Sequence, residues 1–157
     1  MLSKFKRSKH QQHLAQLPKL PQTVADVRTL YAPSDFRTTL LDAIANATQR
    51  IYLVALYLEH DDAGREILNA LYQAKQRRPE LEICVLVDWH RAQRGRIGAA
   101  AANTNADWYC AMAGQHPEQS VPIYGVPVNT REALGVLHLK GFVVDDTVIY
   151  SGASIND

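Results

Sequence analysis

His138 and Lys140 are the residues of this chain whose types and spacing best suit chemistry on a phosphate ester. They lie two apart in the apolar run Val136–Val144, which we predict to be a strand, so both side chains should leave the same face. An imidazole can act as a nucleophile or as an acid or base, and an ammonium group can bind phosphoryl oxygens. The alternative is the polar side of a half-exposed sheet, because many strands are polar on one face.

Residues that follow this pair could complete a phosphate site. Gly141 would allow a close backbone approach, and Asp145 ends the predicted strand four residues later. The segment Tyr150–Asn156 then offers a glycine turn with small hydroxyl groups and an amide, Ser154 and Asn156 among them. These groups can donate neutral hydrogen bonds to a phosphate. Asp145 also suits a plain turn residue.

The spacing His138-x-Lys140-x₄-Asp145, followed by Gly152-x-Ser154-x-Asn156, resembles the HxKxxxxD signature of the phospholipase D superfamily. Nearly all 157 residues resemble the amino-terminal part of the bacterial phospholipase D-type phosphatidylserine synthases, with the closest stretches at residues 10–18, 87–98 and 129–138. Those enzymes carry a second HxKxxxxD motif in a second half, whereas His138 is the only histidine here with a lysine two residues later. We therefore expect a fragment of a longer two-motif enzyme, or a chain that pairs with a second copy.

The resemblance implies a two-step transfer that needs no metal and no cofactor. A histidine attacks CDP-diacylglycerol, CMP leaves, and the phosphatidyl-histidine intermediate passes its lipid to serine. His138 would be this nucleophile or the acid/base across the pocket, and Lys140 would hold the non-bridging oxygens. Ser154 and Asn156 would donate to the same phosphate. Asp145 would orient an imidazole, which in this superfamily can belong to the opposite half.

A basic segment follows the second predicted strand and could bind the cytidine diphosphate. Ligands sit at the carboxyl ends of strands in open α/β sheets, and arginine suits bidentate phosphate contacts. The candidate residues are His90, Arg91, Arg94 and Arg96. Solvated loop charge is the alternative.

The pattern of apolar residues predicts an α/β fold with a mixed sheet flanked by helices, one phospholipase D-like half. We expect strands at 51–58, 81–87, 121–126, 136–144 and 148–150, with Pro122 placing the third at an edge. Helices are expected from Ser34 or Asp35, from Asp61 or Asp62 to Pro79, and over 103–113. The segment 89–98 should be a polar loop, and Cys84 should be buried.

The domain we predict spans residues 23–157 and follows a loose basic arm, residues 1–22. Lys4, Lys6, Arg7 and Lys9 lie in this arm, with no acidic residue before Asp26. The arm could dock on an anionic membrane, touch ribosomal RNA, or be merely solvated. The net charge of +1 argues against a surface built to hold nucleic acid. Cys84 and Cys110 suggest no disulfide framework, so we expect a cytoplasmic protein, and because no apolar run is long enough to span a bilayer we expect its membrane contact to be peripheral.

Three functions remain open from the sequence. The first is phosphatidyl transfer from CDP-diacylglycerol to serine. The second is a homodimeric phosphodiesterase that hydrolyses lipid or nucleic acid by the same chemistry. The third is a catalytically silent lobe that binds lipid or a protein partner.

Overall fold

The computed structural model describes residues 11–95, 104–128 and 137–155, and the chain divides into two compact units between Ala32 and Pro33. In the first unit, residues 11–16 are helical, where we had expected an irregular arm. The short 3₁₀ helix η1 (Val24–Asp26) follows, and its capping box joins Thr23 to Asp26. The α/β unit therefore begins at Pro33, rather than at the predicted residue 23.

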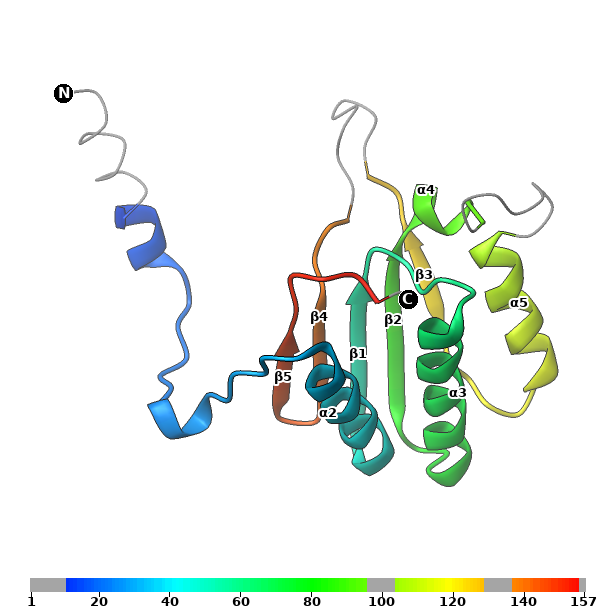
Figure 1. The fold of residues 1–157 in the computed structure, drawn as a ribbon, viewed down its shortest axis with the longest axis horizontal. Helices are drawn as coiled ribbons and strands as arrows, with labels where there is room; N and C mark the ends of the chain where they lie inside the picture. The colour runs from blue at the N-terminus through cyan, green and yellow to red at the C-terminus, as the bar shows by residue number, and fades with distance from the viewer. Residues whose placement is uncertain (1–10, 96–103, 129–136, 156–157) are drawn as a thin grey trace. The chain divides into compact units, whose positions relative to one another are not determined.

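The second unit is built on a five-stranded mixed sheet with the strand order β3-β2-β1-β4-β5 (Figure 1). β1 and β2 are parallel, as are β2 and β3, while β4 runs antiparallel to both β1 and β5. This arrangement confirms the predicted mixed sheet, its parallel first pair and the edge position of β3. The strands are β1 (Arg50–Ala55), β2 (Glu82–Asp88), β3 (Ile123–Val126), β4 (Gly141–Val144) and β5 (Thr147–Tyr150).

In the described part of this unit, four helices accompany the sheet, and capping residues in the sequence mark the start of several of them. They are α2 (Pro33–Asn46), α3 (Asp62–Arg77), α4 (Trp89–Ala92) and α5 (Asn105–Gln115). Asp61 caps α3 by accepting the N–H of Gly64 at 2.8 Å, and Thr104 caps α5. α4 lies within the segment that we had predicted to be a loop. Asp88, the last residue of β2, caps this short helix. An aspartate at the end of a strand could have predicted that a helix follows it.

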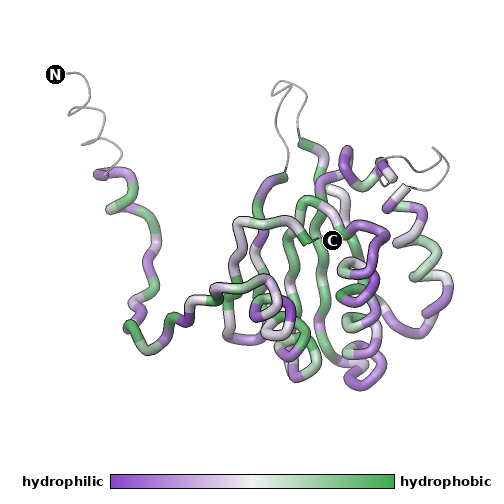
Figure 2. Tube along the Cα trace, viewed as in Figure 1, coloured by the Kyte–Doolittle hydropathy of each residue, from purple (hydrophilic) through white to green (hydrophobic). Residues whose placement is uncertain are grey.

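The hydrophobic core lies between one face of the sheet and the helices. Alternate residues of the central strands point into it, and Phe142 of β4 meets Phe36 of α2 with ring centroids 5.8 Å apart. Figure 2 shows hydrophobic stretches along the central strands β1 and β2. The buried set also includes Leu40, Ile44, Ile51, Leu53, Leu68, Leu71, Val85, Trp108 and Tyr109.

The opposite face of the sheet is largely apolar, with Arg50 and Glu82 at one end and the buried Asp88 at the other, and the apolar side chains between them are not buried. The strand registers place in this face Tyr52, Val54, Cys84, Leu86, Tyr124, Val143, Val148 and Tyr150. Val148 and Tyr150 are 72% and 71% exposed. The prediction that Cys84 is buried was wrong, because strand alternation turns its side chain to this face. We call these eight residues the open sheet face.

No helix in the described parts of the chain combines the length and apolar character needed to cross a membrane.

Candidate active site

His138 and Lys140 precede β4 rather than lying within it. Strand pairing between β4 and β1 starts at Gly141, which is opposite Val54, and β1 ends one residue later at Ala55. We had expected both strands to be longer. Because β1 stops there, residues 137–140 do not pair with it. The segment that leads into β4 therefore lies beyond the paired strands, next to the carboxyl end of β1 (Figure 1).

The two side chains nevertheless come together. Lys140 Nζ lies 3.1 Å from His138 Nε2. An ammonium group can only donate, so a charged Lys140 makes this hydrogen bond with the tautomer that carries its proton on Nδ1 and accepts at Nε2. In that tautomer the Nε2 lone pair points at Nζ of Lys140. A phosphate oxygen bound to Lys140 would therefore also lie close to Nε2.

Lys140 is held in place by the segment after β5. Lys140 is only 4% exposed, whereas His138 is exposed. Ser151 donates its backbone N–H to the carbonyl of Lys140 at 3.2 Å, and Nζ lies 3.5 Å from the carbonyl oxygen of Gly152. A buried ammonium group with one long contact to a carbonyl and one to an imidazole retains donor capacity for an anion.

Ser154 belongs to that same segment, since it follows Gly152 by two residues, and it is partly exposed. The chain is fixed beyond it by Ile155, which is buried in the core. The structure thus brings Ser151 and Gly152, at the start of this segment, to Lys140, and the role of Ser154 stays a prediction. Asn156, the other expected phosphate donor, lies outside the described residues.

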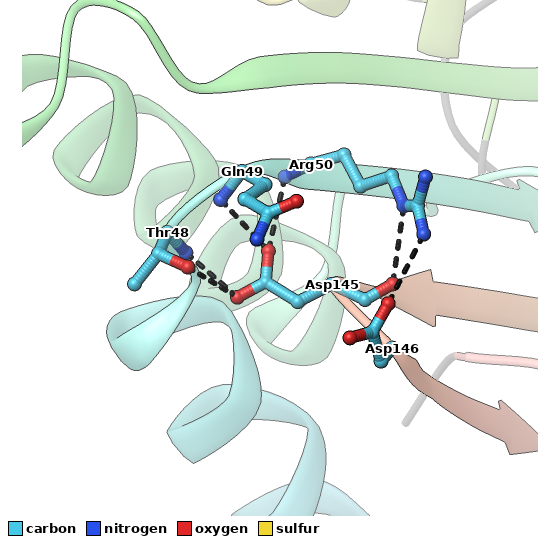
Figure 3. Close-up of polar contacts among 5 residues, drawn as sticks. All are labelled: Thr48, Gln49, Arg50, Asp145 and Asp146. Atoms are coloured by element: carbon cyan, nitrogen blue, oxygen red, sulfur yellow. Dashed lines mark hydrogen bonds and ion pairs between the residues drawn. The ribbon is translucent and has the colours of Figure 1, made fainter.

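Asp145 lies at the opposite end of β4 from the His–Lys pair, in the turn that leads to β5 (Figure 3). Its carboxylate accepts the backbone N–H groups of Thr48, Gln49 and Arg50 at 2.8, 2.8 and 3.0 Å, and the Thr48 hydroxyl at 2.9 Å. Hydrogen bonds from these backbone groups, that of Arg50 above all, hold the pKa of Asp145 well below its ordinary value. Its backbone φ is 50°, a left-handed conformation that aspartate tolerates. Within the part of the chain that is described, this side chain anchors a turn and does not orient His138.

The predicted nucleotide-binding segment forms α4 and the residues after it, at the carboxyl end of β2. His90 and Arg94 are exposed, and Arg91 is partly exposed. Gly125 of β3 allows α4 to pack closely, because a Cβ there would lie 2.7 Å from Cδ1 of Trp89. Arg96, the last of the four candidates, lies outside the described residues.

Asp88 connects this segment to the His–Lys pair, and we had not assigned it a site role. One carboxylate oxygen accepts the N–H of Arg91 at 2.8 Å, and the other accepts the N–H of Leu137 at 2.9 Å. Leu137 directly precedes His138. An aspartate that ends a buried strand just before a basic segment was the available signal in the sequence.

The sequence and the fold are similar to those of known proteins. The chain is 73% identical over its whole length to the CDP-diacylglycerol–serine O-phosphatidyltransferase PssA of Escherichia coli K12, and covers 35% of that protein. The crystal structure of a phosphatidylserine synthase from Haemophilus influenzae superposes with a TM-score of 0.83 at 48% identity, covering 96% of this chain and 33% of that one. Nuc, a phospholipase D family member from Salmonella typhimurium, gives a TM-score of 0.50 at 25% identity, covering 76% of this chain and 64% of Nuc.

The chain spans about a third of the length of the phosphatidyltransferases that it matches first. The family model described as "Cardiolipin synthase, PLD-like domain" matches residues 40–156, which include every strand of the sheet and the His–Lys pair. The chain belongs to this family of phospholipase D-like domains.

Proposed function

We propose that this chain supplies the amino-terminal part of an active site that transfers a phosphatidyl group from CDP-diacylglycerol to L-serine, giving phosphatidylserine and CMP. The contact between Lys140 Nζ and His138 Nε2 carries this proposal, because it sets an imidazole nitrogen beside a buried cation in the spacing that the motif requires. Identity of 73% along the whole chain to a protein named for this transfer supports the choice of substrates.

The reaction would proceed in two balanced steps. In the first, an imidazole Nε2 attacks the phosphorus that bears the diacylglycerol, the bond to the CMP oxygen breaks, and CMP leaves with the electron pair. In the second, the serine hydroxyl attacks the same phosphorus, loses its proton to an acid/base group, and releases the imidazole. His138 is the nucleophile or the acid/base, and the second histidine comes from the other half.

Lys140 would stabilise the charge on the non-bridging oxygens in both steps. Its Nζ replaces the contact to His138 with a contact to phosphate as the lipid substrate binds, which frees Nε2 for attack or proton transfer. Ser154 and Asn156 would donate neutral hydrogen bonds to the same group. Asp145 would act at a distance, by fixing the turn that anchors the far end of β4.

The second half of the site would pack against the open sheet face. Strands that pair in parallel are rarely left bare on one side, and an apolar face of eight side chains favours a permanent partner. Since the chain matches a third of its relatives' length, we assign this place to a second HxKxxxxD half in the same full-length protein. A second copy of this chain is the alternative occupant.

The substrates suggest roles for the basic segments. The diphosphate and cytosine of the nucleotide would be bound near the carboxyl end of β2 by His90, Arg91, Arg94 and Arg96.

The basic residues of the N-terminal arm would hold the protein reversibly on anionic lipid, at the cytoplasmic surface where the lipid substrate lies. Flotation with phosphatidylglycerol vesicles, compared with binding to ribosomes at the same salt concentration, separates lipid from RNA as the partner of the arm.

A labelled-serine assay tests the proposed function in the longest form of the protein that the gene encodes. We expect CMP release from CDP-diacylglycerol to depend on serine, and label to appear in phosphatidylserine. His138→Ala should abolish it, whereas His116→Ala, which removes a ring stacked on Tyr72, should leave it intact. Serine-independent release of CMP and phosphatidic acid would instead identify a hydrolase. Lipid binding without turnover would identify a silent lobe.

A further inference from the structure

Asp88 is a fully buried acidic residue at the carboxyl end of β2, with 0% of its surface exposed. Placing a carboxylate in the interior is costly unless both oxygens have partners. Here each oxygen has one: Oδ1 accepts the N–H of Arg91, and Oδ2 accepts the N–H of Leu137, which lies 49 residues further along the chain. The side chain therefore joins two segments that only the fold brings together.

Capping α4 explains only the first of these bonds. A helix cap needs one acceptor, and the hydroxyl of Thr104 meets this need for the longer helix α5. The second oxygen of Asp88 instead binds the main chain one residue before His138. Because Leu137 precedes β4, the sheet ladder does not fix its N–H, and Asp88 provides the hydrogen bond in its place.

We propose that Asp88 is a positioning residue for the phosphatidyl transfer, holding the backbone that carries His138 in register with α4. This inference rests on the proposed function. Through these two bonds, one carboxylate holds both the backbone next to His138 and α4, which carries His90 and Arg91. Losing the Leu137 bond lets the histidine drift relative to the bound substrate. A misplacement of about 1 Å can cost about 100-fold in rate.

Two substitutions separate this role from helix capping. Asp88→Asn keeps an oxygen for the Arg91 N–H, and asparagine caps a helix as well as aspartate does. Its amide nitrogen is a donor, however, and cannot accept the N–H of Leu137. Asp88→Ser also retains a capping oxygen but is too short to reach both segments, and it provides a second test if the amide variant folds poorly.

Lys75→Met is the matched control at the other end of the same strand. Lys75 Nζ donates to the carbonyls of Pro79 and Leu81, just before β2 begins, at 2.6 and 2.7 Å. This substitution also removes two polar contacts to the main chain beside β2, but at the end of the strand away from His138. It should lower the melting temperature and leave turnover unchanged.

Steady-state kinetics and amide hydrogen exchange in the full-length protein decide the proposal. We expect Asp88→Asn and Asp88→Ser to lower kcat by about 10- to 100-fold with little change in KM for either substrate. The Leu137 amide should be protected in the unmodified protein and exchange about tenfold faster in both variants, but not in Lys75→Met.

Three results would overturn the inference: an unprotected Leu137 amide in the unmodified protein, unchanged exchange in the variants, or a kcat no lower than that of the control. A protein that shows no serine-dependent CMP release would refute the proposed function instead, and the Leu137 exchange would still report on the Asp88 bond.

Discussion

Asp145 and Arg50 are joined in both directions across the end of the sheet away from the His–Lys pair. Arg50 donates its N–H to the Asp145 carboxylate at 3.0 Å and its Nε–H to the Asp145 carbonyl at 3.1 Å. The N–H of Asp145 returns a bond to the carbonyl of Arg50 at 2.9 Å. The last residue of the HxKxxxxD motif thus ties the turn after β4 to the first residue of β1, and its contribution should be visible as stability.

Asp145→Asn should destabilise the fold in a pH-dependent way. Because hydrogen bonds lower the pKa of the folded carboxyl below 3.8, its contribution is complete above that pH and is lost as the pH falls further. We expect a loss of about 1–2 kcal/mol at pH 7 for this partly exposed group, and a smaller difference from the unmodified protein at pH 3.

Asparagine is the informative replacement because it tolerates the positive φ, whereas alanine would add backbone strain. Urea unfolding at several pH values measures the difference. Asp146→Asn, which removes a single exposed ion pair with Arg50, is the control and should change stability very little. A difference between Asp145→Asn and the unmodified protein that stays constant from pH 7 to pH 3 would contradict the assignment.

Lys140→Met should lower turnover while leaving the fold intact. Methionine fills much of the space of the buried stem but cannot bind phosphate oxygens, so kcat should fall by about 100- to 1,000-fold. The melting temperature and the CMP produced per minute are measured on the same preparation. Lys75→Met again controls for the loss of a lysine bonded to main-chain carbonyls. A kcat within a few-fold of the unmodified enzyme would remove Lys140 from the chemistry.

The elements that the sequence predicted well are those with a strong local signal. Asp61 and Pro79 bracket α3, and apolar runs mark β1 and β2, so their order and parallel pairing followed. The ends of strands were less predictable. His138 and Lys140 read as strand residues, but the ladder starts only at Gly141, because pairing depends on where β1 stops.

Long-range contacts explain the rest of what the sequence did not reveal. The bond between Asp88 and Leu137 spans 49 residues, and those from Asp145 to Thr48, Gln49 and Arg50 span more than 90. No periodicity or motif encodes such partners. The meeting of His138 and Lys140 could be anticipated because the two residues are close in sequence and share a motif.

Gly64→Ala should destabilise the α/β unit. A Cβ at this position would lie 1.9 Å from the carbonyl oxygen of Glu59, so the first turn of α3 or the loop after β1 must move. We expect a loss of at least about 2 kcal/mol. Gly114→Ala in α5 has no atom within 4 Å of the added methyl and should be neutral or slightly stabilising. Equal melting temperatures for the two variants would contradict the close approach.

Val148→Glu tests whether the open sheet face is covered in the full-length protein. Val148 is 72% exposed in this chain, so a charge there would be harmless if the face met water. If a second half packs on it, the carboxylate is buried without a partner, and the melting temperature should fall by several degrees with loss of turnover.

The control for Val148→Glu is Val24→Glu, at a valine that is 94% exposed and lies outside the sheet. We expect no measurable effect there. Chromatography distinguishes the two occupants of the face. If the face is covered by a second half of the same chain, Val148→Glu leaves the apparent molecular mass unchanged. If it is covered by a second copy, the substitution dissociates the dimer and the apparent mass falls by half. A fully active and stable Val148→Glu protein would show that the site does not assemble across this face, and the second histidine would have to approach His138 from another side.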